Sequence, residues 1–184
     1  VLVGTKTDGF EPLVMTREFH YIGACDWGGP GGYFNGTIAY LKIWHGVELS
    51  QSDVTTLHTA VITCSVLDKL YHSTDGDNWT NKGNWMSSTI SLCSWYGIAC
   101  NENGEITKID LHDNNLRGTV PAELGALGTL TELRLYTNHL TGEIPSELSS
   151  LTSLTYFHLG GNELTGSIPS WIGTFTSLQT LALY

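Results

Sequence analysis

Charged and aromatic side chains with the chemistry of a binding surface recur every 24 residues in the C-terminal part of the chain. Arg134, Tyr136 and Tyr156 are of the residue types favoured at binding hot spots. Neighbouring repeats also place opposite charges side by side, and such pairs occur on surfaces that bind nothing, where each contributes about 0–1 kcal/mol. The candidate binding residues are Lys108, Asp110, His112, Glu132, Arg134, Tyr136, Tyr156 and His158.

Catalytic chemistry is not indicated. The sequence contains no Walker loop, no GxGxxG turn, no HExxH and no GxSxG, and its seven histidines are not spaced with a nucleophile as in a triad. Asp26 is a lone acidic residue in the Gly-rich loop at residues 25–36. The DGDN turn at residues 75–78 lacks the ligand series and the terminal Glu of an EF-hand. We therefore expect neither enzyme activity nor a cofactor, and the sequence gives little support for a bound Ca²⁺.

A strict internal repeat over residues 106–184 must position the candidate residues. Asn114, Asn138 and Asn162 mark its 24-residue period, and a Leu, a Gly and a Pro follow each of them at fixed distances. Three apolar residues precede each Asn, and the last two alternate with polar residues, as in a short strand with one buried face. The apolar frames are Ile106, Ile109 and Leu111; Leu130, Leu133 and Leu135; Leu154, Phe157 and Leu159; and Leu178, Leu181 and Leu183.

One coil of this kind cannot bury its apolar residues alone, so the coils are expected to stack into a solenoid. The outward strand positions then fall in columns about 4.8 Å apart. Three columns are predicted: Lys108, Glu132, Tyr156 and Thr180; Asp110, Arg134, His158 and Ala182; and His112, Tyr136, Gly160 and Tyr184.

This repeat closely resembles the leucine-rich repeat in its 24-residue plant-like form. Residues 130–144 read LTELRLYTNHLTGEI, and three full repeats match without a gap. The resemblance implies a solenoid with a parallel β-sheet on one side and short helices or 3-10 turns on the other. We use the term concave face for the outward side of this sheet, where the resemblance implies a protein or glycan ligand.

Residues 61–105 resemble the N-terminal cap of plant-like leucine-rich repeat proteins. This segment contains Trp79, Trp85 and Trp95 and directly precedes the first repeat, where such a cap belongs. The order of segments predicts the cap at 61–105 and the repeats at 106–184, with three full repeats and a truncated fourth.

The four cysteines are interpreted through the same cap resemblance. Cys93 and Cys100 are expected to form a disulfide, whose short loop gives a modest entropic gain. Cys25 and Cys64 would then pair with each other and join two domains, although Cys64 could instead pair inside the cap. A zinc site for all four is disfavoured by the C-x6-C spacing and by the lack of a second close pair.

Residues 1–60 resemble the C-terminal part of a laminin G-like or concanavalin-like jelly roll. The resemblance rests on short strands, the Gly-rich loop and the run YFNGTIAYLKIW. It implies a partial β-sandwich of a family that often binds glycans, sometimes with Ca²⁺. The paired carboxylates that the related glucanases need are absent from this stretch. Two short helices are predicted to follow, one after Ser50 and one starting at Ser65.

The composition and two sequons place the protein outside the cell. The 18 acidic and 8 basic residues give a net charge of −10, which argues against a nucleic-acid partner. No apolar run approaches the length of a membrane span. The sequons at Asn35 and Asn78, together with the cysteines, predict a secreted or cell-surface glycoprotein. Both ends look cut, so we expect a piece of a longer protein.

These features favour a non-catalytic extracellular protein that recognises or scaffolds, binding glycan or protein through the β-sandwich and the concave face. One alternative is a self-assembling structural subunit of an extracellular glycoprotein filament or surface coat. A second is a receptor ectodomain with a membrane span further along the chain. A third is an enzyme whose catalytic carboxylates precede Val1.

Overall fold

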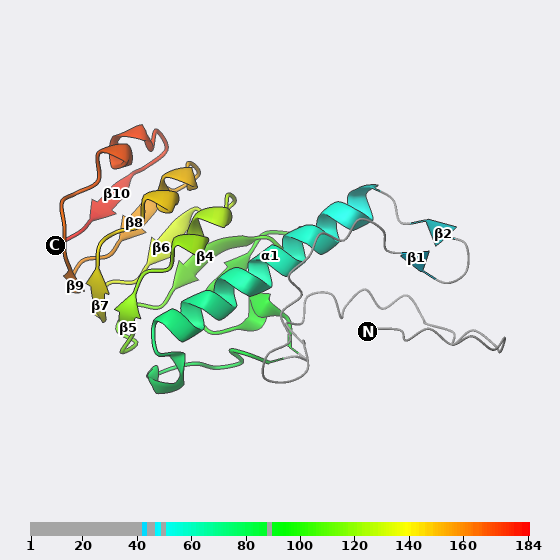
Figure 1. Ribbon diagram of the computed structural model, residues 1–184, viewed down its shortest axis with the longest axis horizontal. Helices are drawn as coiled ribbons and strands as arrows, with labels where there is room; N and C mark the ends of the chain where they lie inside the picture. The colour runs from blue at the N-terminus through cyan, green and yellow to red at the C-terminus, as the bar shows by residue number, and fades with distance from the viewer. Residues whose placement is uncertain (1–41, 44–46, 49–50, 88–89) are drawn as a thin grey trace.

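The C-terminal two thirds of the chain form a stack of coils preceded by a long helix (Figure 1). The computed structural model describes residues 42–43, 47–48, 51–87 and 90–184, with side chains from residue 62 onward. The helices are α1 (Gln51–Ser73) and the 3-10 helices η2 (Gly76–Asn78), η3 (Leu92–Ser94), η4 (Ala122–Ala126), η5 (Ser146–Ser150) and η6 (Ser170–Thr174). The strands are β1 (Lys42–Ile43), β2 (Val47–Glu48), β3 (Ile98–Cys100), β4 (Ile106–Asp110), β5 (Arg117–Thr119), β6 (Glu132–Arg134), β7 (His139–Gly142), β8 (Tyr156–His158), β9 (Glu163–Leu164) and β10 (Thr180–Ala182).

Two parallel ladders run along the stack. The larger sheet has the order β10-β8-β6-β4-β3, in which β3 pairs antiparallel with β4 and the other pairs are parallel. The smaller sheet has the order β5-β7-β9 and is also parallel. This second sheet was not expected from the sequence. Figure 1 shows β4, β6, β8 and β10 side by side, with α1 alongside the first coils.

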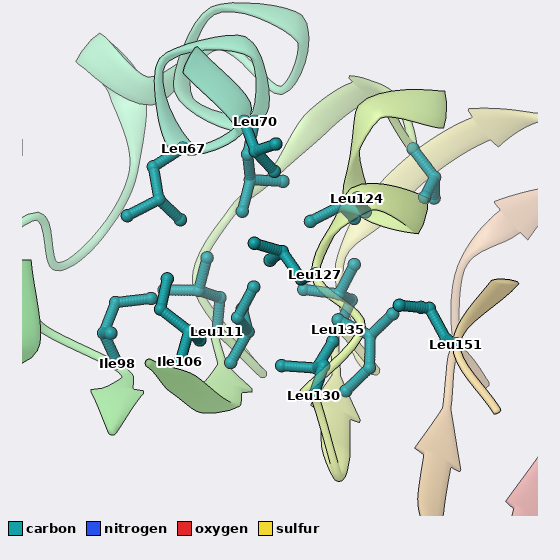
Figure 2. Packing of buried hydrophobic residues seen from close by; sticks show 14 of the residues in the cluster. Leu67, Leu70, Ile98, Ile106, Leu111, Leu124, Leu127, Leu130, Leu135 and Leu151 are labelled. Atoms are coloured by element: carbon teal, nitrogen blue, oxygen red, sulfur yellow. The ribbon is translucent and has the colours of Figure 1, made fainter. Parts of the chain in front are cut away.

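The apolar frames form the core of the stack. All nine frame positions of the first three coils are at most 2% exposed, and each buried Leu or Ile contributes roughly 1.5–3 kcal/mol. Leu124 of η4 and Leu148 of η5 are fully buried and close the side of the core opposite the larger sheet. Leu67 and Leu70 of α1 are also fully buried, and Figure 2 shows them pointing toward the interior of the first coil. The helix and the repeats therefore share one core.

The repeated residues Asn114, Asn138 and Asn162, which we name the asparagine ladder, tie each coil to the coil before it. Asn138 Oδ1 accepts from the backbone N–H groups of Asn114 and Leu116, both at 3.0 Å. Its Nδ2 donates to the carbonyls of Leu111 and Leu135, both at 2.9 Å. The Asn138 amide thus bonds the backbone of its own turn and the backbone of the preceding coil.

The cap acts as an additional coil at the start of the stack. The backbone N–H of Asn81 donates to Oδ1 of Asn114 at 2.6 Å. In return, Nδ2 of Asn114 donates to the backbone carbonyl of Asn81 at 2.9 Å. Trp79, Trp85 and Trp95 are buried, and the ring of Trp85 contacts the rings of the other two. The Cys93–Cys100 disulfide, which closes the cap as predicted, lies next to them in the sequence.

Several predictions about the N-terminal part need correction or lie beyond the described residues. The two predicted short helices are one continuous helix, because no Gly or Pro interrupts residues 51–73. Ser65 therefore caps no helix, and the predicted domain boundary at residue 60 falls inside α1. Of the run YFNGTIAYLKIW, the structure describes only Lys42–Ile43, which form β1. Of the predicted jelly-roll segment, the structure also describes β2 and the start of α1, and residues 1–41, 44–46 and 49–50 lie outside the described residues.

The fourth apolar frame is less buried than the first three. Leu181 pairs with Phe157 in the sheet, yet its side chain is 44% exposed. Leu178 and Leu183 are only partly buried. The reason is that no coil of the described chain covers the outer side of β10.

Replacing Asn138 with Ala should destabilise the solenoid by at least about 3 kcal/mol. Several buried backbone groups lose their hydrogen-bond partner, and each unsatisfied group costs about 1–3 kcal/mol. Urea unfolding followed by circular dichroism measures this change. Asn103→Ala, at an exposed turn before β4, is the matched control and should change stability by less than about 0.5 kcal/mol. Similar unfolding midpoints for the two variants would contradict this assignment of the asparagine ladder.

Candidate functional site

The outward columns have the predicted register. Lys108, Glu132 and Tyr156 are direct neighbours across β4, β6 and β8, and Thr180 of β10 continues the column. The second column, Asp110, Arg134, His158 and Ala182, is formed in the same way. The third-column residues His112, Tyr136, Gly160 and Tyr184 follow the ends of their strands. The eight candidate residues therefore occupy one face.

Four charged side chains on this face form one network. The predicted pairs across the strands are present, with Lys108 Nζ 3.7 Å from Glu132 Oε2 and Arg134 Nη1 3.7 Å from Asp110 Oδ2. The shorter contacts run along each strand, from Lys108 to Asp110 at 3.1 Å and from Arg134 to Glu132 at 2.8 Å. Because two positive and two negative groups meet, the network is electrically balanced.

Aromatic rings form a second contact line across the coils. His112 stacks on Tyr136 with centroids 4.7 Å apart, and Tyr136 stacks on His158 at 4.2 Å. His158 belongs to the second column and its partners to the third, so the stack crosses between columns. Gly160 lies beside this stack, where a Cβ would collide with the carbonyl oxygen of Tyr184 and would lie 3.1 Å from His158 Nε2.

Arg134 links the charged network to the rings. Its guanidinium carbon lies 4.2 Å from the ring centroid of Tyr156, which is a cation–π contact. Among the described residues, Arg134 Nε and His158 Nδ1 are buried without a hydrogen-bond partner. We name Arg134, Tyr136, Tyr156 and His158 the aromatic strip.

Two pKa values on this face are shifted. Burial would raise the pKa of Asp110, but hydrogen bonds with His112 and Lys108 outweigh it and hold the pKa below its usual value. Burial and the nearby positive charge of Arg134 lower the pKa of His158. At neutral pH Asp110 is therefore ionised and His158 is uncharged.

A hollow of about 290 Å³ lies where the cap meets the first repeat. We name it the cap hollow. Its lining consists of Tyr96, Gly97, Ile98, Ala99, Lys108, Asp110 and His112. Gly97 is required at this junction, since its φ is +77° and a Cβ would collide with the carbonyl oxygen of Asp110. Strand β3 thereby approaches β4 closely and brings Tyr96 to the candidate residues.

The cap residues of this hollow were not among the predicted site residues. Their only sequence signal is the short run Tyr96-Gly97-Ile98-Ala99 between two cysteines, and nothing in that run shows that it will pair antiparallel with β4. The stack across columns was also missed, because it joins His158 of the second column to Tyr136 of the third, and the 24-residue period does not indicate contacts between columns.

The other predicted site residues are distributed as follows. Asn78 is exposed and its Nδ2 lies 3.0 Å from each carboxylate oxygen of Asp75. Cys64 is disulfide-bonded, but its predicted partner Cys25 lies outside the described residues, as do Asn35 and Asp26. Within the described part of the chain, no three His, Cys, Asp or Glu side chains are grouped so as to hold a metal ion.

Comparisons with known proteins identify the repeats. The Leucine Rich Repeat family model matches residues 105–127, 129–151 and 153–175. Leucine-rich repeat protein 1 of Arabidopsis thaliana is 39% identical over 43 residues, which are 23% of this chain and 20% of that protein. The chain thus spans about a fifth of the length of this relative.

Solved structures give the same fold over a longer segment. A plant ice-binding protein is 28% identical with a TM-score of 0.59, over 65% of this chain and 38% of that one. The BIR3–SERK2 complex from Arabidopsis thaliana contains a chain that is 32% identical with a TM-score of 0.55, over 64% of this chain and 65% of that one.

These matches and the coil geometry define a solenoid of parallel strands and 3-10 turns. More specifically, the chain carries leucine-rich repeats of the plant type behind an N-terminal cap region. None of these matches supports the predicted jelly roll of residues 1–60. The disulfide bonds of this chain are typical of proteins that fold in the secretory pathway. None of the helices in the described part of the chain has the length and apolarity needed to cross a membrane.

His158 should make the fold sensitive to acid. Because its folded-state pKa lies below the ordinary value of 6.5, the unfolded chain takes up a proton first, and stability is lost as the pH falls through this range. His158→Gln should therefore lose less stability than the wild type between about pH 7 and about pH 5, measured by urea unfolding. The same substitution at the exposed His139 is the control, and an equal effect of both variants would refute the prediction.

Asn78 should carry an N-linked glycan in protein from its native source, because the side chain is exposed on the cap and begins an Asn-Trp-Thr sequon. Peptide mass spectrometry before and after glycosidase treatment tests this. Thr80→Ala should remove the glycan and Thr80→Ser should keep it. An unmodified Asn78 peptide in the native protein would show that the sequon is unused. Asn35 is predicted to be modified as well.

Proposed function

We propose that this chain is a non-catalytic extracellular recognition module that binds a protein partner through the concave face. The observation that carries the proposal is the aromatic strip, in which Tyr136, Tyr156 and Arg134 share one surface with His158. Tyr and Arg are the residue types that contribute most binding energy at protein interfaces. The relative in the BIR3–SERK2 structure is itself part of a protein complex.

The geometry of the strip supports this function in a second way. The rings and the guanidinium hold one another in place before any partner arrives, so binding immobilises few additional rotamers. The charges around the strip are balanced, and Arg134 is 27% exposed. A partner can therefore cover the face without trapping a net charge, which would be costly.

Arg134→Ala should weaken partner binding at least tenfold. The truncation removes the cation–π contact, and it leaves the negative charges of Asp110 and Glu132 with less positive charge to balance them. The secreted wild-type chain, immobilised, is used to retain proteins from extracellular extract of its source. A retained protein is then purified and its Kd is measured by calorimetry for each variant.

Arg117→Ala is the matched control. Arg117 is an exposed arginine of β5, in the smaller sheet, and its loss should change the Kd less than about twofold. A partner that binds Arg134→Ala as tightly as the wild type, or that is lost with Arg117→Ala instead, would place recognition on another face. Unchanged urea midpoints in both variants exclude unfolding as the cause.

A further inference from the structure

Three residues whose side chains differ in chemistry line the cap hollow. Tyr96 belongs to the cap, and this aromatic residue is 37% exposed. Lys108 and His112 come from the first repeat, with side chains 33% and 43% exposed. The hollow therefore combines an accessible aromatic surface with two accessible polar groups, which is the usual composition of a small-ligand site.

His112 offers the hollow a hydrogen-bond acceptor. Its Nδ1 lies 2.6 Å from Oδ1 of Asp110, and an ionised carboxylate can only accept, so Nδ1 carries the proton. In the neutral ring Nε2 is then left as an acceptor. Lys108 has three N–H donors, and its ion pairs are with only two carboxylates. One side of the hollow thus presents an acceptor and a donor.

Charge and size restrict the ligand. Lys108 and Asp110 neutralise each other, and the chain as a whole has a net charge of −10, so an anionic ligand is disfavoured. The volume of about 290 Å³ lies at the small end of the roughly 300–1,000 Å³ typical of ligand pockets. The remaining lining, Gly97, Ile98 and Ala99, has no polar side chain. A neutral, ring-sized ligand with one apolar face and several hydroxyl groups fits these limits.

We propose that the cap hollow binds a neutral sugar ring of an extracellular glycan. The apolar face of the ring packs on Tyr96, one hydroxyl donates to Nε2 of His112, and another accepts from Nζ of Lys108. The residues of the aromatic strip do not line the hollow, although His112 stacks on Tyr136, so the chain has two adjoining recognition sites of different chemistry. This second site does not depend on the proposed protein interaction.

The test uses the secreted chain alone, with neutral gluco-, manno- and galacto-oligosaccharides as probes. Saturation-transfer NMR identifies which of them bind, and calorimetry gives the Kd. Tyr96→Ala should weaken binding about tenfold, which corresponds to about 1.4 kcal/mol. Tyr184→Ala is the matched control, since Tyr184 is 92% exposed on the last coil, and it should leave the Kd unchanged.

A second variant keeps the test decisive if Tyr96→Ala fails to fold. Ala99 is exposed on β3 within the lining, and Ala99→Trp should fill the hollow and abolish sugar binding while the unfolding midpoint is kept. The absence of saturation transfer from every probe at about 10 mM, where even weak Kd values of about 1 mM would register, overturns the proposal. Equal Kd values for Tyr96→Ala and Tyr184→Ala overturn it as well.

The protein interaction gives the remaining outcome. If binding of a protein partner depends on Tyr96 and no oligosaccharide binds, the hollow belongs to the protein interface and the sugar site is refuted. Because the sugar titration contains no protein partner, it can fail or succeed independently of the Arg134 experiment.

Discussion

The buried asparagine ladder is the constraint on which the rest of the structure depends. Each coil must turn inward after its strand, and this turn would leave backbone N–H and carbonyl groups of two coils buried and unpaired. Asn114 and Asn138 are only 1% and 6% exposed, and their amides satisfy these groups. Because the bonds fix each coil against the one before it, they also keep the strands in register. The columns of the concave face follow from that register.

On this face two kinds of interaction hold the same coils together. The ion pairs join the first two repeats, while the stack of His112, Tyr136 and His158 extends over three. Arg134 takes part in both the ion network and the ring contacts. The surface is therefore ordered by contacts among its own side chains. A face ordered in advance in this way loses little conformational entropy when a partner covers it.

The period of 24 residues was sufficient to predict the frames, the columns and their register, because burial in a solenoid repeats with the sequence. Features without a period were harder to predict. The continuity of α1 was missed because the local capping signal at Ser65 competes with the absence of any Gly or Pro nearby. The ring stack joins residues of two different columns, and the cap hollow depends on the antiparallel pairing of β3 with β4. Both are tertiary effects that single residues do not indicate.

The asparagine ladder also has a kinetic consequence. Its bonds between successive repeats join residues only 22 to 27 positions apart, so every repeat closes a loop of nearly the same length. The cap contact between Asn81 and Asn114 spans 33 residues. Since doubling a loop costs only about 0.6 kcal/mol of closure entropy, no coil is much harder to add than another. Folding can therefore start in whichever coil has the most favourable local sequence and spread to its neighbours.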